Sequence, residues 1–287
     1  IDEIRAQGLE LVTISYDTPE VLAAFAEEQG ITYTMLADVG SATIIEYGIL
    51  NTVAEEALGP DADDPDVMAD FALLVSVTAP NEMFVGIAYP GTFMLDREGV
   101  VESRFFEDSY QERNTASNIM LKLGTGGSSV EGTEISTNYV EILTYPSDAV
   151  VAPGERLSLV LDIAPRPTMH LYAPGAELQH YRVITLRIDP QPFVRILPLE
   201  YPESEIYYFE PLDERVPVYQ RPFSLLQEVV AEVTRDAQAA FDGKDELTLT
   251  GSLDYQACDD EVCYNPVTVP VSWTVAMRTL TGRQRRE

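Results

Sequence analysis

The only two cysteines of the chain, Cys258 and Cys263, are the residues whose type and spacing best suit chemistry. Four residues separate them, within the stretch Tyr255-Gln256-Ala257-Cys258-Asp259-Asp260-Glu261-Val262-Cys263-Tyr264-Asn265-Pro266. The tip of a hairpin can bring two such residues to the Cα separation of about 5.5 Å that a disulfide needs. The pair is open to three interpretations: a structural disulfide, a zinc site or a redox-active pair. Zinc is the least favoured, because it needs four ligands and the only histidines, His170 and His180, lack a close spacing.

The residues between the two sulfurs are acidic. Asp259, Asp260 and Glu261 disfavour a thiolate on either cysteine, because a nearby negative charge raises the pKa of a thiol. A redox-active pair in this setting is a poor nucleophile by itself. We therefore expect exchange with a dedicated partner that supplies complementary geometry.

The sequences on both sides of the cysteines predict a β-hairpin. Apolar residues alternate with polar ones at a period of two on both arms, which is typical of strands with one buried face. The apolar positions are Leu247, Leu249, Leu253, Tyr255, Val267, Val269, Val271, Trp273 and Val275. If these positions face the core, Ala257 points inward and Cys258 points outward. One sulfur would then be accessible to a partner.

The composition limits the class of protein. A chain of 287 residues with 45% apolar residues is globular and long enough for two domains. Its net charge of −30 disfavours binding to nucleic acid or to an anionic membrane surface, and favours solubility or a cationic partner. No run of 18 apolar residues predicts a membrane span. Because the chain begins with Ile1 and shows no signal-peptide pattern, we expect it to be a piece of a longer precursor.

The first half has an α/β pattern. Strands are predicted over 9–15 and 31–36, and helices over 19–29 and 41–47, which favours a mostly parallel sheet. The helix over 19–29 begins with Thr18 as its N-cap and Pro19 at its first position, and Gly30 ends it. The acidic stretch at 61–66 lacks the central Gly and the distal Glu of a calcium loop, so we interpret it as a solvated loop.

The segment Tyr89-Pro90-Gly91-Thr92-Phe93-Met94-Leu95-Asp96-Arg97-Glu98-Gly99-Val100-Val101 predicts a strand, a tight turn and a returning strand, and a terminal helix follows over 109–123. Together with GLELVTISYDTPEVLAAFAEEQGITYTMLAD and YGIL, it resembles the redoxin branch of the thioredoxin fold, the alkyl hydroperoxide reductase and thiol-specific antioxidant superfamily. The resemblance places Pro90 at the family's cis-proline position. The family's reactive cysteine lies upstream of the helix with which this chain begins, and residues 1–124 contain no cysteine. We expect that this segment was lost by truncation, the alternative being a degenerate scaffold.

The second half has an all-β pattern. Residues 125–134 are rich in Gly and Ser and predict a flexible linker after a redoxin domain at 1–124. Short strands at 139–143, 157–163 and 183–188 favour an immunoglobulin-like sandwich over 135–279, and 280–287 would be a polar tail.

Two motifs of this half resemble the N-terminal periplasmic domain of the thiol:disulfide interchange protein DsbD. They are Met169-His170-Leu171-Tyr172-Ala173-Pro174-Gly175 and the cysteine-bearing stretch, and the resemblance covers roughly 135–275. It implies an immunoglobulin-like fold in which Cys258 and Cys263 are the catalytic pair. In that family the pair takes electrons from a membrane-embedded domain and passes them to periplasmic thioredoxin-like or isomerase proteins.

The resemblance also implies side chains that line the site. An aromatic cap loop covers the family's cysteines, and its candidate here is 206–211, with Tyr208 and Phe209. His170, Tyr172 and Tyr255 are further candidates. For each of these the plain alternative is ordinary packing, as a hydrogen-bonded histidine or a core aromatic residue.

One segment is ambiguous. Leu225, Leu226, Val229, Val230 and Val233 recur at helical spacing and predict a helix over 223–240. The DsbD resemblance implies a strand for the first half of this range, and we expect the strand because a sandwich needs it.

The function expected from these features is thiol–disulfide exchange through Cys258 and Cys263, in the periplasm or another extracytoplasmic compartment and without a cofactor or metal. The expected partner is a thioredoxin-like or membrane-embedded thiol–disulfide protein, with the absent redoxin cysteine as a natural candidate across the linker. One alternative is a non-catalytic interaction module with a structural disulfide. A remnant of a peroxiredoxin-like peroxidase is another, but it needs a cysteine that residues 1–124 lack.

Overall fold

The computed structural model describes residues 1–74, 80–106, 112–124, 130–210 and 213–278. The chain divides into two compact units, Ile1–Arg113 and Asn114–Glu287, which are described separately below. This division falls before the helix that the sequence placed at the end of a redoxin domain, whereas our expected boundary followed it at residue 124. Of the expected linker, 125–129 lies outside the described residues, and a strand already begins at Thr133. The expected tail at 280–287 also lies outside them.

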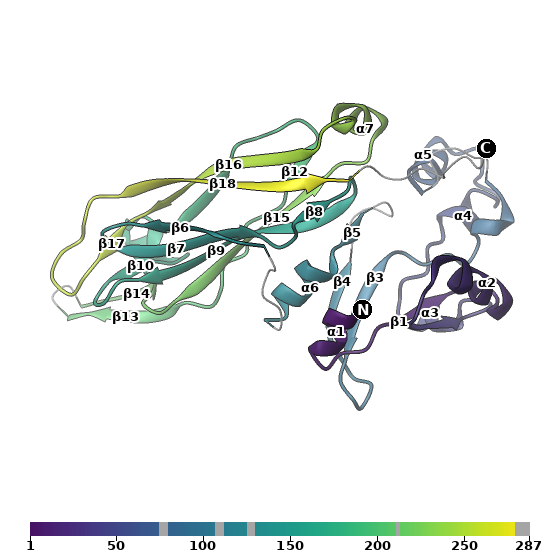
Figure 1. Cartoon of the computed structure of the whole chain (residues 1–287), viewed down its shortest axis with the longest axis horizontal. Helices are drawn as coiled ribbons and strands as arrows, with labels where there is room; N and C mark the ends of the chain where they lie inside the picture. The colour runs from purple at the N-terminus through teal and green to yellow at the C-terminus, as the bar shows by residue number, and fades with distance from the viewer. Residues whose placement is uncertain (75–79, 107–111, 125–129, 211–212, 279–287) are drawn as a thin grey trace. The chain divides into compact units, whose positions relative to one another are not determined.

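The first unit has the predicted alternation of strands and helices (Figure 1). Its elements are α1 (Asp2–Ala6), β1 (Val12–Ser15), α2 (Pro19–Gln29), β2 (Thr34–Ala37), α3 (Ala42–Glu46), α4 (Val53–Glu56), α5 (Pro65–Leu74), the 3-10 helix η1 (Glu82–Phe84), β3 (Gly91–Leu95) and β4 (Val101–Phe106). β1 and β2 pair in parallel, and β3 and β4 form a separate antiparallel pair. The α/β class is therefore confirmed, although the described strands of this unit form two small sheets and not one.

Local sequence signals fix the ends of α2. The Thr18 hydroxyl accepts a hydrogen bond from the Val21 backbone N–H at 3.4 Å, and Pro19 occupies the first turn, where no backbone donor is needed. Gly30 ends the helix at φ 64°, a left-handed conformation that costs glycine little. Both predicted boundaries of this helix are confirmed.

The expectation of a cis peptide bond at Pro90 is wrong. No peptide bond is cis among the residues that the structure describes. The Tyr89 backbone N–H donates to the Ile49 carbonyl at 2.7 Å, and Leu50 forms a β-bridge with Ala88. These backbone contacts join the segment before β3 to Ile49 and Leu50, and its trans bond is the form favoured by about 0.5–1 kcal/mol before proline.

The second unit is built mainly of strands, as predicted. Its elements are β5 (Arg113–Asn114), which pairs with β9, α6 (Ala116–Lys122), β6 (Thr133–Ser136), β7 (Val140–Pro146), β8 (Val150–Val151), β9 (Glu155–Pro165), β10 (His170–Tyr172), the 3-10 helix η2 (Ala176–Gln179), β11 (Thr185–Ile188), β12 (Val194–Ile196), β13 (Glu205–Phe209), β14 (Glu214–Tyr219), β15 (Phe223–Ala231), α7 (Arg235–Phe241), β16 (Glu246–Tyr255), β17 (Ala257–Cys258) and β18 (Val267–Met277). One sheet has the order β12-β15-β9-β7-β6, and a second has the order β11-β16-β18-β8.

The apolar side chains of these two sheets form the main core. The predicted hairpin is confirmed: β16 and β18 pair along their length, with Leu249 opposite Trp273 and Leu253 opposite Val269. These four side chains are buried in one cluster with leucines of β9. Gly251 lies on the same face of β16 by alternation, and glycine is needed there because an added Cβ would overlap the Arg187 carbonyl of the neighbouring strand.

The ambiguous segment is a strand followed by a helix. Residues 223–231 form β15, which pairs with β9, and residues 235–241 form α7. The strand that we preferred for the first half is confirmed. The Thr234 hydroxyl accepts from the Ala237 backbone N–H at 3.2 Å and so caps the helix.

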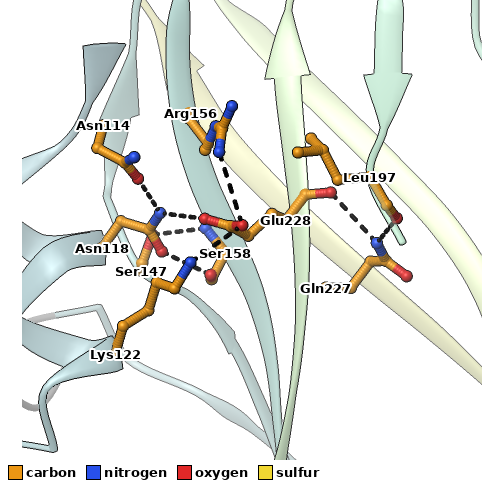
Figure 2. Close-up of polar contacts among 9 residues, drawn as sticks. All are labelled: Asn114, Asn118, Lys122, Ser147, Arg156, Ser158, Leu197, Gln227 and Glu228. Atoms are coloured by element: carbon orange, nitrogen blue, oxygen red, sulfur yellow. Dashed lines mark hydrogen bonds and ion pairs between the residues drawn. The ribbon is translucent and has the colours of Figure 1, made fainter. Parts of the chain in front are cut away.

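Helix α6 packs on β9 and β15 through polar side chains (Figure 2). Asn118 is fully buried, and its amide Nδ2 donates to Glu228 Oε1 at 2.9 Å and to Asn114 Oδ1 at 2.7 Å. The Ser158 hydroxyl donates to Asn118 Oδ1 at 2.5 Å. Lys122 Nζ lies 3.2 Å from Glu228 Oε2. Ser158 and Glu228 are register partners in β9 and β15, so both project from the sheet face opposite the main core.

Candidate disulfide site

A third sheet, with the order β13-β14-β10-β17, contains Cys258 on β17, and Cys263 follows in the adjoining loop. β17 follows β16 directly in the chain and pairs with β10, with Cys258 opposite His170 and Ala257 opposite Leu171. In Figure 1 this sheet lies at the tip of the β16–β18 hairpin, and α7 lies at the other end of the sandwich. The hairpin thus carries the cysteines out of the main core and into a separate layer.

Cys258 and Cys263 are bonded to each other as a disulfide, with Cα atoms 4.1 Å apart. The loop between them is held by the Asp259 N–H, which donates to the Val262 carbonyl at 3.0 Å. The Tyr264 N–H donates to the Ala257 carbonyl at 2.9 Å. The backbone of the hairpin tip therefore brings the two sulfurs together.

The two cysteines differ in exposure. Cys258 is 1% exposed, whereas Cys263 is an exposed residue. The predicted orientation holds in part: Ala257 lies in the main core, and Cys258 projects from the other face. The expectation that Cys258 would be accessible is wrong, because a second apolar cluster covers that face. Its other buried members are Tyr172, Ala176, Val216 and Val218.

Tyr172 contacts both sulfurs. Its hydroxyl oxygen lies 3.1 Å from Cys258 Sγ and 3.3 Å from Cys263 Sγ. Because disulfide sulfurs carry no hydrogen, Tyr172 must be the donor in this state. Its ring stacks on Tyr181 at 4.2 Å between centroids, and the Tyr181 hydroxyl donates to Glu214 Oε2 at 2.7 Å. Burial raises the pKa of Tyr172, so the hydroxyl keeps its proton.

His170 lies on the same face as Cys258 and is sandwiched by aromatic rings. It is 3% exposed, its ring centroid is 4.5 Å from that of Tyr207, and Tyr172 meets it edge-on at 5.6 Å. The Tyr207 hydroxyl donates to Asp260 Oδ1 at 2.8 Å, which joins β13 to the disulfide loop. Phe209 stacks beside Tyr207 at 6.5 Å.

The predicted lining residues fall into two groups. The first group is near the disulfide: His170 and Tyr172 lie beside it, and Phe209 stacks on Tyr207. The second group, Tyr255 and Tyr208, does not contact it. Tyr255 is fully buried in the main core, where its hydroxyl is 2.9 Å from that of Thr137. Tyr208 is 46% exposed and donates to Asp213 Oδ1 at 2.9 Å.

The residue that sequence reasoning did not single out is Tyr207. It lies within the segment expected to form a cap, but only Tyr208 and Phe209 were chosen from that segment. Alternation along β13 places Tyr207 and Phe209 on one face and Tyr208 on the other. Applying a period of two to this short segment would have paired Phe209 with Tyr207.

Asp259 maintains a negative charge next to the disulfide. Its carboxylate accepts hydrogen bonds from the backbone N–H groups of Glu261 and Val262 at 2.9 and 2.6 Å, and from the Tyr264 hydroxyl at 2.7 Å. These hydrogen bonds lower the pKa of Asp259, those from the backbone of Glu261 first. The acidic surroundings inferred from the sequence are therefore present in the folded site.

Among the described residues, the structure contains no cluster of three or more metal-ligating side chains. Within the same part of the chain, no helix is both long and apolar enough to cross a membrane.

Comparison with known families gives a match in each half of the chain. Residues 1–104 match the model of the AhpC/TSA family. Residues 141–272 match the model described as thiol:disulfide interchange protein DsbD, N-terminal. No curated protein matches the chain.

Two solved structures illustrate the structural similarity. The N-terminal periplasmic domain of ScsB from Proteus mirabilis is 12% identical, with a TM-score of 0.34, and the alignment covers 51% of each chain. The chain thus spans about half the length of that domain. The N-terminal domain of DsbD from Neisseria meningitidis, in the reduced form, is 18% identical, with a TM-score of 0.27 over 42% of this chain and 81% of that one.

The family matches and the bonded cysteine pair indicate thiol–disulfide chemistry as a class of reaction. The chain contains a thioredoxin-like α/β region that matches the AhpC/TSA family, followed by an immunoglobulin-like sandwich that matches the N-terminal domain of thiol:disulfide interchange protein DsbD.

Proposed function

We propose that the chain performs thiol–disulfide exchange through Cys258 and Cys263. The observation that carries the proposal is the asymmetry of the bonded pair: Cys263 is exposed, whereas Cys258 is buried and hydrogen-bonded to Tyr172. An exchanging disulfide needs one sulfur that a partner thiolate can reach and a second that can leave. The site has both.

The exchange proceeds in two displacements. A partner thiolate attacks Cys263 Sγ, the Cys258–Cys263 bond breaks, and its electron pair stays on Cys258 Sγ as a thiolate. The second thiolate of the partner then attacks its own sulfur in the mixed disulfide and releases Cys263 as a thiolate. The partner ends as a disulfide and has given up two electrons, and this chain, now with two reduced sulfurs, takes up the two protons that the partner thiols released. The reverse sequence transfers the electrons onward.

The partner in this proposal is a thioredoxin-like or membrane-embedded thiol–disulfide protein. The compartment is extracytoplasmic, periplasmic if the source is a bacterium with two membranes, since disulfides persist mainly in oxidising compartments. The matches to the AhpC/TSA and DsbD models support a redox partner of this kind. Three carboxylates border the exposed sulfur, at Asp259, Asp260 and Glu261, so a partner surface with basic residues around its cysteine fits this site best.

A purely structural disulfide is the competing interpretation. Closing a loop of about six residues stabilises a fold by only about 2 kcal/mol in the chain-entropy model. The same loop is already held by the pairing of β17 with β10 and by the hydrogen bonds to Asp259. A staple here would add little, which favours exchange.

A redox titration decides between the two. The full chain would be equilibrated with a series of glutathione or dithiothreitol buffers, and the oxidised fraction read from the mass shift after thiol alkylation. We expect a midpoint above about −270 mV, within the range of exchanging proteins, and oxidation of a reduced thioredoxin-like protein in a coupled assay. A midpoint below about −300 mV with no transfer to that protein would identify a staple.

Tyr172→Phe tests the hydrogen bond to the sulfurs. Loss of the hydroxyl removes a donor that stabilises the leaving thiolate on Cys258 while preserving the stacking on Tyr181. A hydrogen bond to a charged group is worth about 1.5–3 kcal/mol, so we expect exchange to slow by at least about tenfold. The measurement is the second-order rate of reduction by a thioredoxin-like dithiol. Tyr208→Phe is the matched control, because that hydroxyl bonds Asp213 on the other face of β13; equal rates in both variants would contradict the role of Tyr172.

A further inference from the structure

The buried sulfur of the pair needs a positive counterpart that the hairpin itself does not provide. Opening of the disulfide leaves a thiolate on Cys258, which is 1% exposed and adjoins Asp259, Asp260 and Glu261 in the chain. Burial and like charge both oppose that thiolate. Tyr172 supplies a hydrogen-bond donor but no charge.

His170 is the basic side chain placed to supply the charge. It is the register partner of Cys258 across β10 and β17, so the two side chains stand next to each other on the same face of the sheet. Its ring is enclosed between Tyr207 and Tyr172. Neither ring nitrogen of His170 makes a hydrogen bond within the described parts of the chain, so the ring is free to take up a proton.

The groups that face His170 come from every neighbouring element. β17 contributes Cys258, β13 contributes Tyr207, and β10 itself contributes Tyr172. The hairpin loop contributes the carboxylates of Asp260 and Asp259, which favour the protonated imidazole, while burial lowers its pKa and is the larger effect. From β14, Glu214 acts on Tyr172 through Tyr181. The pKa of the imidazole therefore lies below its ordinary value in the oxidised protein, and two carboxylates are already placed to support its protonation.

We propose that His170 takes up a proton when the Cys258–Cys263 disulfide opens, and that the resulting imidazolium offsets the thiolate on Cys258. This inference rests on the proposed exchange function. The S–S electron pair goes to Cys258 Sγ, and the proton comes from solvent or from the partner thiol that was deprotonated for attack. By linkage the effect is mutual. The thiolate raises the pKa of the imidazole by the same amount as the imidazolium lowers the pKa of the thiol. His170 acts as a positioning residue whose charge state follows the redox state.

The test measures this mutual shift without a partner protein. In the full chain with Cys263→Ser, Cys258 is the only thiol, and its ionisation is followed by thiolate absorbance against pH. We expect His170→Gln to raise the pKa of Cys258 by about one unit, which leaves about tenfold less thiolate at pH 7. His180→Asn is the matched control, since His180 is the other histidine of the chain and lies at the exposed end of η2 with a φ of 67° that Asn tolerates.

A second measurement removes the dependence on the folding of His170→Gln. The imidazole titration of His170, followed by NMR and assigned with His180→Asn, is compared between Cys263→Ser and the variant in which both cysteines are Ser. We expect the imidazole to titrate at a higher pH, by about one unit, when the Cys258 thiol is present. Identical titration in the two proteins would overturn the inference.

The outcomes separate this inference from the function on which it rests. If the wild-type chain fails to oxidise a thioredoxin-like dithiol while the mutual shift of His170 and Cys258 is present, only the exchange function falls. If exchange is present and the two titrations are independent, only the role of His170 falls.

Discussion

A Cys258→Ser variant is expected to form a long-lived mixed disulfide through Cys263, whereas Cys263→Ser is expected to react at least about a hundredfold more slowly with the same disulfide reagent. The reason is the difference in exposure: Cys263 lies at the surface, and Cys258 lies beneath Tyr172 and the valines of β14. A buried thiol reacts only after local opening, and an opening cost of about 3 kcal/mol corresponds to about two orders of magnitude in rate. Reaction with a chromogenic aryl disulfide, and trapping with a thioredoxin-like protein that lacks its resolving cysteine, both measure this.

The control is the same pair of variants in denaturant. There the two thiols are equally exposed, so their rates should agree within a small factor and report only the acidic neighbours that both share. Equal rates in the folded proteins would contradict the asymmetry and with it the assignment of Cys263 as the attacked sulfur. Trapping through Cys258 alone would reverse the assignment.

Replacement of Glu228 by Ala is expected to lower the free energy of unfolding of the second unit by about 3–5 kcal/mol. Glu228 is 6% exposed and forms contacts with three side chains around it: the Asn118 amide at 2.9 Å, Lys122 Nζ at 3.2 Å and Arg156 at 3.9 Å. Removing one member of such a buried network leaves charge and hydrogen-bonding groups without compensation, and this loss is what makes the change costly. Urea unfolding measures it, with Trp273 as the reporter, because it is the only tryptophan and lies in the main core.

Glu246→Ala is the matched control for this experiment. Glu246 begins β16 in the same unit but is exposed, so its replacement should change the unfolding free energy by no more than about 0.5 kcal/mol. Glu228→Gln should fall between the two, since it keeps an acceptor for Asn118 but removes the charge that attracts Lys122. A cost for Glu228→Ala equal to that of the control would show that α6 is not held by this network.

The sequence predicted the hairpin and its facing side chains well, because both arms alternate over many residues and one face must be buried. It could not predict the burial of Cys258. Periodicity shows that Cys258 faces away from Ala257, but not whether another layer covers that face. The covering residues, such as Val216 and Val218, come from β14, and the proximity of that strand depends on sheet pairing and not on local pattern.

The placement of α6 was beyond sequence reasoning for a similar reason. Asn118 and Lys122 have the polarity of a solvated helix face, and their partner Glu228 is 110 residues from Asn118 in the chain. Nothing local distinguishes a polar side chain that meets water from one that meets a buried carboxylate. The family resemblance pointed the same way as the local pattern, since it made this helix the end of the first domain.

The docking of α6 has a practical consequence for work with isolated fragments. A fragment that begins after the glycine-rich segment would retain β6 to β18 and both cysteines, yet would lack β5, Asn118 and Lys122 and leave the Glu228 carboxylate with Arg156 as its remaining partner in this network. Its redox midpoint would then be measured on a weakened scaffold. A fragment that starts ahead of Asn114 keeps the helix and is the sound choice for dissecting this half of the chain.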